Sequence, residues 1–327
     1  MADVLVTGAT GFLGSHLVRQ LVSAGERVRV LVRDPDRLAL LGDTGNSVET
    51  VRGEITDPSD MDAAVEGVDA VYHCAAFVGF GGGKEREALM RVNVGGTRVL
   101  VNSALRAGVR RVVHTSSIAA LGRPENPSGC LDESTEWTES KLNTAYAHSK
   151  HLAELEVHRG IAEGLDAVIV NPSVMFGPGG RAGENTTRIV EAVRFGRVPA
   201  IPGGATNVVD IADVAAGHRA AMERGKTGER YLLVGQNLTW DTILRTLANA
   251  LGAEITDRRM GMRTALVLGA LAEAGAWLTR RPPPLTRETA RVTGHRTCYD
   301  NSRARQELGV SFRPFQETAQ RIAEGLA

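Results

Sequence analysis

Cysteine, aromatic residues and net charge are all scarce in this chain of 327 residues. The three cysteines, Cys74, Cys130 and Cys298, are too few and too scattered for a disulfide framework, and no two have the spacing of metal ligands. Because 38 basic residues balance 38 acidic ones, we expect no binding of nucleic acid or of an anionic membrane by bulk charge. Aromatic residues make up only 4%, so small and aliphatic side chains must fill the core.

Long apolar runs are missing as well. The most apolar stretch, residues 264–278, is interrupted by Glu273 and is shorter than the roughly 18 apolar residues that a membrane span needs. A strand-like run begins at residue 4 with no charged leader before it, so we expect no signal peptide and a cytoplasmic location. Two roles stay open for the 264–278 helix: a cap over a substrate pocket, or contact with a partner or a membrane surface.

The chain does contain a regular alternation of apolar, strand-like runs with helical patterns. The strand-like runs lie at residues 4–6, 28–32, 48–51, 70–73, 111–115 and 167–170. The helical patterns between them lie at residues 12–24, 59–65, 85–107 and 143–163. This order predicts an α/β fold built on a doubly wound parallel sheet of the Rossmann type.

The rhythm changes after residue 172, where loops rich in glycine and proline become frequent. Residues 206–235 return to a strand–helix–strand pattern. We therefore predict a first domain of the Rossmann type over residues 1–175, to which 206–235 return, and mainly a smaller C-terminal α/β substrate lobe over residues 176–205 and 236–327.

A glycine-rich turn follows the first strand-like run. Gly8, Gly11 and Gly14 have the spacing Gly-x-x-Gly-x-x-Gly, and a helical pattern follows at once. The first glycine permits a tight turn, the second lets backbone amides approach a pyrophosphate, and the third lets the helix pack close to the strand. The free N–H groups at the helix N-terminus then favour the phosphates. This context favours a dinucleotide site over a plain turn.

The end of the second strand-like run bears on the choice of cofactor. An acidic side chain in this region usually binds the ribose hydroxyls of NAD, and Asp34 is a candidate for that role. Arg33 precedes it, and Arg37 follows one helical turn later. A guanidinium group suits the 2′-phosphate of NADP through its fixed fork of donors. We therefore predict NADP(H) as the preferred cofactor, with NAD(H) as the alternative.

Tyr146 and Lys150 lie at the start of the helical pattern at residues 143–163. Their i, i+4 spacing puts both side chains on one helix face. A nearby ammonium group favours the phenolate and so lowers the pKa of the tyrosine. Tyr146 is therefore a candidate proton donor to a carbonyl oxygen, or acceptor from an alcohol. Such a pair is common by chance, but its place after the fifth strand favours a catalytic role.

Residues 7–14 together with 146–150 resemble the extended short-chain dehydrogenase/reductases, the NAD-dependent epimerase/dehydratase superfamily. The same resemblance extends along nearly the whole chain through residues 73–76, 93–97, 114–117, 171–173 and 300–309. The arrangement at residues 30–35, 115–117 and 171–173 looks most like the dihydroflavonol-reductase-like branch. Members of that branch reduce ketones or aldehydes on apolar or aromatic molecules.

The resemblance implies a role for each matching residue. Tyr146 would be the acid/base, Lys150 would lower its pKa and bind the nicotinamide ribose, and Ser117 would hold the substrate oxygen. Asn93 would support a proton-relay water. Glu54 stands where the family usually has Asp beside the adenine. The full set of expected cofactor contacts is Gly8, Thr10, Gly11, Phe12, Leu13, Gly14, Arg33, Arg37, Glu54, Ile55, Cys74, Ala75, Ala76, Thr115, Lys150, Asn171, Pro172 and Ser173.

A small-molecule substrate is expected next to the nicotinamide. Six residues follow the cofactor motifs and would flank it, although each also fits an ordinary core position: Phe77, Phe80, Leu121, Trp137, Met175 and Phe176. We expect no metal ligands. The resemblance also suggests a homodimer through the fourth and fifth helices of the fold.

Hydride transfer from NADPH to the carbonyl carbon of a ketone or aldehyde is the leading hypothesis. Sugar 4,6-dehydration is disfavoured, because Ile118 and Ala119 stand where the dehydratases carry Asp and Glu. A nucleotide-sugar epimerase is the main alternative, although Thr206 stands where such epimerases place an Arg for the diphosphate. A non-catalytic dinucleotide-binding sensor is the alternative of another class, and the retained Tyr146 and Lys150 disfavour it.

Overall fold

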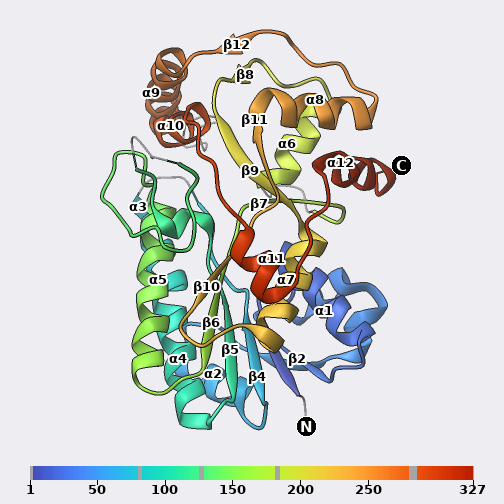
Figure 1. Cartoon of the computed structure of the whole chain (residues 1–327), viewed down its shortest axis with the longest axis vertical. Helices are drawn as coiled ribbons and strands as arrows, with labels where there is room; N and C mark the ends of the chain where they lie inside the picture. The colour runs from blue at the N-terminus through green and yellow to red at the C-terminus, as the bar shows by residue number, and fades with distance from the viewer. Residues whose placement is uncertain (1–2, 80–82, 125–128, 181–184, 280–285, 327) are drawn as a thin grey trace.

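The computed structural model describes residues 3–79, 83–124, 129–180, 185–279 and 286–326 (Figure 1). Within these ranges one parallel sheet has the strand order β10-β6-β5-β4-β1-β2-β3, which confirms the predicted doubly wound fold. Its strands are β1 (Val4–Thr7), β2 (Val28–Val32), β3 (Glu49–Arg52), β4 (Ala70–His73), β5 (Arg111–Thr115), β6 (Ala167–Pro172) and β10 (Arg230–Leu233).

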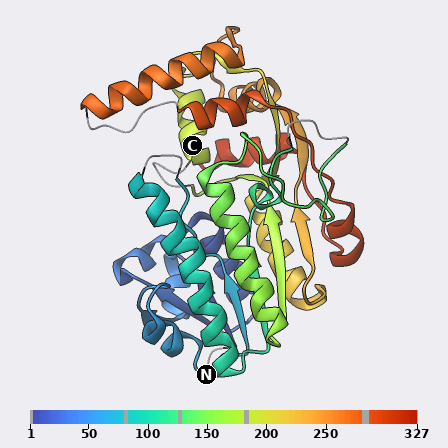
Figure 2. The ribbon, with the colours of Figure 1, turned by 90° about the vertical axis from the view of Figure 1, so that its left-hand side faces the viewer.

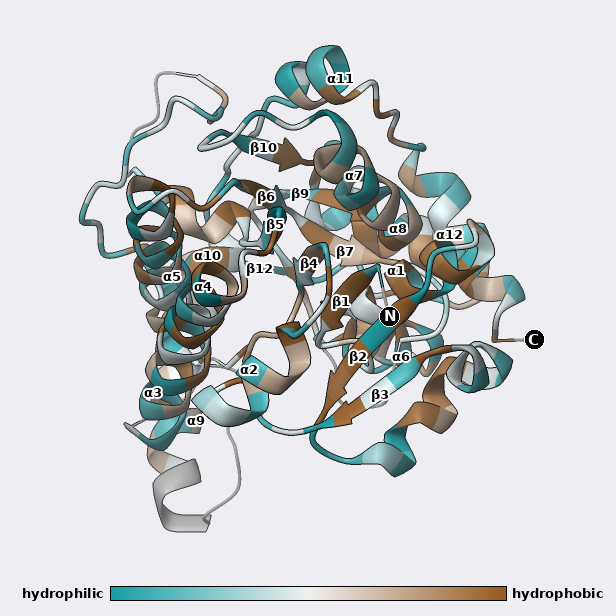
Figure 3. Ribbon diagram, turned by 90° about the horizontal axis from the view of Figure 1, so that it is seen from below, coloured by the Kyte–Doolittle hydropathy of each residue, from teal (hydrophilic) through white to brown (hydrophobic). Residues whose placement is uncertain are grey.

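Two layers of helices bury the two faces of this sheet. Val30 of β2 belongs to the core on one face, and its neighbour Leu31 belongs to the core on the other, as the alternation of a doubly covered strand requires. Figure 3 shows β1 and β2 as hydrophobic strands between the layers. The first layer contains α1 (Phe12–Ser23), α7 (Ile211–Arg224) and α11 (Ser302–Leu308), and the second contains α2 (Pro58–Val65), α4 (Gly96–Ala107) and α5 (Ala145–Ala162).

The helical pattern at residues 85–107 forms three consecutive segments instead of one helix. They are α3 (Gly83–Leu89), a π-helical turn η2 (Met90–Gly95) and α4. π-helical turns are rare and occur frequently at functional sites. Here the turn contains Asn93, one of the expected site residues.

A smaller lobe lies beyond the carboxyl ends of the sheet strands (Figure 1). Its three-stranded sheet has the order β11-β9-β7, formed by β7 (Val174–Phe176), β9 (Ala205–Asp210) and β11 (Gln236–Thr239). Packed with it are α6 (Asn185–Arg194), α8 (Trp240–Leu251) and α12 (Phe315–Glu324). The segment 206–235 contributes β9 to this small sheet and β10 to the large one. The limits given above for the two domains stay a prediction.

The outer part of the lobe contains β8 (Ile201–Pro202), β12 (Arg259–Met260), α9 (Met262–Thr279) and α10 (Arg287–Gly294). α9 packs against α10 (Figure 1). Across the described ranges, no helix combines the length and hydrophobicity that crossing a membrane requires.

Candidate active site

The turn between β1 and α1 fits the phosphates of a dinucleotide. Gly8 has a φ of +70°, and a Cβ there would lie 2.7 Å from the amide nitrogen of Ala75. A Cβ on Gly14 would overlap the carbonyl group of Gly8. Gly11 is the N-cap of α1, and no side-chain hydrogen bond caps the helix. The N–H groups of the first turn can therefore serve an anion.

Three more of the expected cofactor contacts lie on this turn. Thr10 and Phe12 are half-buried, and Leu13 is buried. The ring of Phe12 meets the ring of His16 edge-on at 5.7 Å between centroids. His16 Nε2 in turn forms a hydrogen bond with the carbonyl oxygen of Pro178 at 3.1 Å, so α1 is joined to the segment that follows β7.

The carboxyl end of β2 presents two exposed arginines. Arg33 and Arg37 are both exposed, whereas Val32 before them is buried. Asp34 Oδ1 accepts the backbone N–H of Asp36 at 3.2 Å and caps the 3₁₀ helix η1 (Pro35–Ser47). Asp34, the candidate ligand for the ribose hydroxyls of NAD, thus already accepts a hydrogen bond from the first turn of its own helix.

Glu54 and Ile55 follow β3. Glu54 is exposed, and its backbone N–H donates to Asp60 Oδ2 at 2.8 Å. Ile55 lies against the start of α4, where a Cβ on Gly96 would come within 2.7 Å of Ile55 Cδ1. The segment after β3 thus packs against the helix that follows η2, and its role beside the adenine stays a prediction.

The segment after β4 faces the glycine turn. The backbone N–H of Cys74 donates to the carbonyl of Thr7 at 3.2 Å. Ala75 is half-buried and Ala76 is exposed. Burial raises the pKa of the Cys74 thiol to about 11, so this free cysteine is a neutral thiol at physiological pH.

Lys150 is a buried cation at the carboxyl end of β5. Its side chain is on α5 and only 2% of the residue is exposed. The Nζ atom donates to the carbonyl oxygen of Thr115, the last residue of β5, at 2.7 Å. Burial lowers the pKa of Lys150 to about 8, and the negative charge of Glu154 opposes that shift. Lys150 is therefore charged at neutral pH, close to its titration midpoint.

Tyr146 lies one turn before Lys150 and is hydrogen-bonded to the side chain of Ser117. Burial raises the pKa of the Tyr146 hydroxyl, while Ser117 and the charge of Arg123 oppose this shift. The lowering of the pKa that we expected from Lys150 is therefore not found, because burial of the phenol outweighs the nearby charge. Ser117 is half-buried and caps the short 3₁₀ helix η3 (Ile118–Leu121), with Oγ accepting from the Ala119 N–H at 3.1 Å. The preceding Ser116 is buried, and Ser117 is the serine that contacts the tyrosine.

Asn93 uses its buried side chain to join three elements. Its Oδ1 accepts the backbone N–H of Phe77 at 2.7 Å, and its Nδ2 donates to the Phe77 carbonyl at 3.0 Å. Nδ2 also donates to Ser149 Oγ at 2.9 Å. The π-helical turn thereby connects the segment after β4 to α5 directly beside Lys150. A proton-relay role for Asn93 stays a prediction.

The segment after β6 is buried and fixed by side-chain hydrogen bonds. Asn171 Nδ2 donates to the carbonyl of Ser117 at 3.0 Å and to Glu154 Oε1 at 2.7 Å. Pro172 ends the strand, and Ser173 Oγ donates to Asn207 Oδ1 of β9 at 2.7 Å. Asn171 therefore links three elements of the site: β6, the Ser117 turn and α5.

Glu154 is a residue that sequence reasoning misses. It lies four positions after Lys150 on α5 and is 1% exposed. Its Oε2 faces Arg230 at 3.5 Å. A glutamate in a helix is usually solvent-exposed, and the only sequence signal was its i+4 spacing from Lys150.

Three histidines near Lys150 are buried and neutral. Burial lowers the pKa of His73 to about 3 and that of His218 to about 4, and it places the pKa of His114 far below its usual value. His73 Nδ1 is 2.7 Å from Thr7 Oγ1, and His218 Nε2 is 2.7 Å from Thr115 Oγ1. In the described part of the chain, no group of three or more His, Cys, Asp or Glu residues could hold a metal ion.

The expected substrate residues have different surroundings. Phe77, Trp137 and Met175 are half-buried, and the Trp137 ring stacks on His151 with centroids 4.4 Å apart. Leu121 and Phe176 are fully buried in hydrophobic cores, so their side chains are closed to solvent. Phe80 lies outside the described residues.

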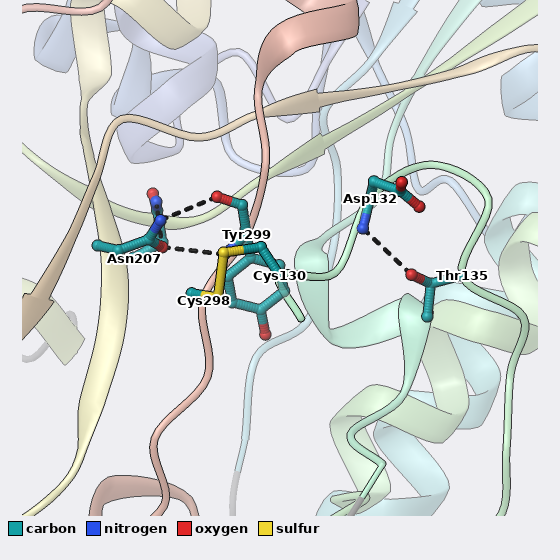
Figure 4. The surroundings of a disulfide bond; sticks show 7 residues. Cys130, Asp132, Thr135, Asn207, Cys298 and Tyr299 are labelled. Carbon is teal, nitrogen blue, oxygen red and sulfur yellow. Dashed lines mark hydrogen bonds between the residues drawn. A yellow bond between two sulfur atoms is a disulfide. The ribbon is translucent and has the colours of Figure 1, made fainter. Parts of the chain in front are cut away.

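A disulfide joins Cys130 to Cys298, 168 positions apart (Figure 4). The two segments also pair through their backbones, since the N–H of Leu131 donates to the Cys298 carbonyl at 2.9 Å. The scattered cysteines led us to expect no disulfide framework, and this single bridge was not predicted, because spacing in the sequence does not show which loops the fold brings together. The bridge ties the loop between η3 and α5 to the segment before α11.

Known proteins resemble this chain over nearly its whole length. A family model described as the NAD dependent epimerase/dehydratase family matches residues 4–234. Sterol demethylase protein B from Methylococcus capsulatus is 38% identical, over 94% of this chain and 92% of the relative. A putative dihydroflavonol 4-reductase from Synechocystis is 36% identical, over 95% and 90%. The solved structure of a nucleoside-diphosphate-sugar epimerase from Pseudomonas aeruginosa has a TM-score of 0.78 and 27% identity, covering 99% of this chain and 97% of that one.

Proposed function

The chain belongs to the NAD dependent epimerase/dehydratase family, and from this premise we propose that it is an NADPH-dependent reductase of a ketone or aldehyde. Family membership makes it an NAD(P)-dependent oxidoreductase of the extended short-chain dehydrogenase/reductase type. The proposal adds the direction and the substrate, a small apolar or aromatic carbonyl compound. The observation that carries it is the meeting of Ser117, Tyr146 and the buried Lys150 at the carboxyl end of β5.

In the proposed reaction Tyr146 donates its hydroxyl proton to the carbonyl oxygen, which becomes the alcohol hydroxyl. NADPH held at the glycine turn of residues 8–14 would supply the hydride that the carbonyl carbon receives. Ser117 holds the same oxygen, since its side chain is already hydrogen-bonded to Tyr146. The positive charge of Lys150 stabilises the phenolate that Tyr146 becomes. In reverse, the same groups oxidise an alcohol.

The preference for NADPH over NADH rests on the end of β2. Arg33 is exposed there, while the neighbouring Asp34 accepts a hydrogen bond from its own helix. A guanidinium group can bind a 2′-phosphate through two parallel hydrogen bonds. These features support the proposed preference.

A sugar epimerase is the second candidate, favoured by the similarity to the epimerase structure over 99% of this chain. Such an enzyme removes and returns a hydride and leaves its cofactor unspent. The substrate lobe has Thr206 on β9 where the resemblance leads us to expect an arginine for the diphosphate. Steady consumption of NADPH separates the reductase from the epimerase.

The proposed function predicts that Tyr146→Phe loses carbonyl reduction. Absorbance of NADPH and of NADH is followed with a panel of ketones and aldehydes. The wild type should oxidise NADPH steadily and prefer it to NADH. The variant should be slower by about 100- to 10,000-fold, the usual contribution of general acid catalysis. No turnover by the wild type, or equal turnover by Tyr146→Phe, would exclude this function.

We also propose a homodimer that forms through α4 and α5, which lie side by side on the outside of the molecule (Figure 2). Leu155 of α5 is 49% exposed and offers apolar surface for such a contact.

We propose a cytoplasmic location from the sequence alone. A disulfide such as Cys130–Cys298 is uncommon in that compartment.

A further inference from the structure

Arg123 is a charged residue beside the site to which the proposed reaction gives no role. It follows Gly122, whose φ is +76°, in the segment between η3 and α5. Its backbone N–H donates to Asn143 Oδ1 at 2.9 Å, and Asn143 lies just before α5 begins. Arg123 is thereby fixed next to the first turn of the helix that carries Tyr146.

The guanidinium group of Arg123 lies among groups from three elements. It forms a hydrogen bond with the hydroxyl of the buried Tyr299, and its charge opposes the effect of burial on the pKa values of Tyr299 and Tyr146. It acts in the same way on Glu288 of α10. The cation is thus close enough to influence the proton donor of the proposed reaction.

One nitrogen of this guanidinium group lacks an acceptor. Arg123 Nη1 is buried and has no hydrogen-bond partner among the described residues. Buried polar groups of proteins are nearly always hydrogen-bonded, and a charged donor without an acceptor is costly. Glu288 Oε1 already accepts the backbone N–H of Ala145 at 2.7 Å. An acceptor from a bound molecule would complete the site.

We propose that Arg123 binds a carboxylate that the substrate carries close to its reactive carbonyl, as in a 3-oxo acid. A carboxylate presents one negative charge and matches the fork of a single guanidinium group. A phosphate would bring a second negative charge towards Glu288. This inference rests on the proposed reductase function and narrows its substrate to an oxo acid.

A matched pair of substrates tests the proposal: 3-oxooctanoate and its methyl ester, each with NADPH. The wild type should have a kcat/KM at least tenfold higher for the acid. Arg123→Met should lower the kcat/KM for the acid by roughly 10- to 100-fold relative to that for the ester, as expected for loss of a charged hydrogen bond. The ester reports the effect of the lost charge on Tyr146, which both substrates share. Arg123→Lys keeps the positive charge but lacks the forked donors of the guanidinium group, so it should lose part of the preference for the acid over the ester. Arg110→Met is the matched control, because Arg110 is exposed at the amino end of β5.

The outcomes separate this proposal from the reductase function. An acid preference that is absent in the wild type, or unchanged in Arg123→Met, overturns the carboxylate site and leaves reduction intact. Turnover that survives Tyr146→Phe overturns the function, whichever way Arg123 behaves. If neither substrate is reduced, calorimetry with 3-hydroxyoctanoate and NADP⁺ decides: binding by the wild type that Arg123→Met lacks supports the site, and no binding by the wild type overturns it. Should Arg123→Met fail to fold, the Arg123→Lys comparison decides in the same way.

Discussion

Lys150 shares its buried surroundings with a carboxylate that holds the site together. Glu154 is 1% exposed, accepts a hydrogen bond from Asn171 at 2.7 Å and faces Arg230 at 3.5 Å. A buried carboxylate without such partners would cost several kcal/mol. Through Asn171 the same carboxylate is connected to the carbonyl of Ser117. Glu154 is therefore a positioning residue and a counter-charge for Lys150.

The titration of Lys150 predicts an alkaline limit to carbonyl reduction. Its pKa is lowered to about 8, so the positive charge is present below that pH and is lost as the pH rises through it. We expect kcat/KM for reduction to fall above about pH 8. Because the charge of Glu154 raises the pKa of Lys150, Glu154→Gln should move this alkaline limb to lower pH.

The pH profile of kcat/KM with NADPH and the best carbonyl substrate measures both effects. Glu156→Gln is the control, since Glu156 lies on the same helix and pairs with Arg159 at 3.0 Å, away from Lys150. A limb that stays in place in Glu154→Gln, or moves to higher pH, would contradict the assigned counter-charge. A lower kcat without a shift would indicate a purely structural role.

Some residues of the site could be predicted from the sequence, and others could not. Tyr146 and Lys150 were predictable because their i, i+4 spacing is a local property of one helix. Glu154 and Arg123 gain their significance from burial and from neighbours such as Asn171 and Tyr299. Those neighbours belong to other elements, so no spacing within the sequence predicts the contacts.

Among the helices, the segment around Asn93 departs from the periodic pattern. The pattern at residues 85–107 suggested one continuous helix, but a π-helical turn separates α3 from α4. Hydrophobic periodicity gives the type of an element better than its local winding. The hydrogen bonds of Asn93 to Phe77 and Ser149 occur in that turn.

The close packing of α1 on the turn after β1 predicts that a methyl group added at Gly14 destabilises the fold. In Gly14→Ala the new Cβ would overlap the carbonyl of Gly8, so helix and turn must move apart. We expect a loss of about 1–3 kcal/mol in the free energy of unfolding, the usual cost of overpacking, together with weaker NADPH binding. Urea unfolding and fluorescence titration with NADPH measure the two effects.

Gly95→Ala is the matched control for this substitution. The nearest atom to a Cβ on Gly95 is the Met90 carbonyl oxygen at 3.8 Å, which is an ordinary van der Waals contact. Alanine there should leave stability unchanged or raise it slightly, since glycine is the poorer helix former. Equal effects of the two substitutions would show that the contact between Gly14 and Gly8 does not govern the turn.

At the scale of the whole molecule, the order of strands and helices could be predicted from the sequence. The contacts between segments that are far apart in the sequence could not. Buried runs such as 4–6 and 167–170 are continuous and apolar because both faces of their sheet are covered. The pairing of Leu131 with the strand-like segment at Tyr299 depends instead on how the lobe returns to the first domain. No pattern within either segment predicts this pairing.

The Cys130–Cys298 disulfide predicts that a reductant destabilises the chain. Closing a loop of 168 positions restricts the unfolded state, which corresponds to a stabilisation of up to about 5 kcal/mol in the chain-entropy account. Dithiothreitol should therefore lower the urea midpoint of the wild type and of Cys74→Ser, the control with the free cysteine removed. It should have no effect on Cys298→Ser, which already unfolds at the lower concentration. Thiol titration of the unfolded protein should find one group before reduction and three after it. Three groups before reduction, or an equal response of Cys298→Ser to the reductant, would show that the bridge does not form in solution.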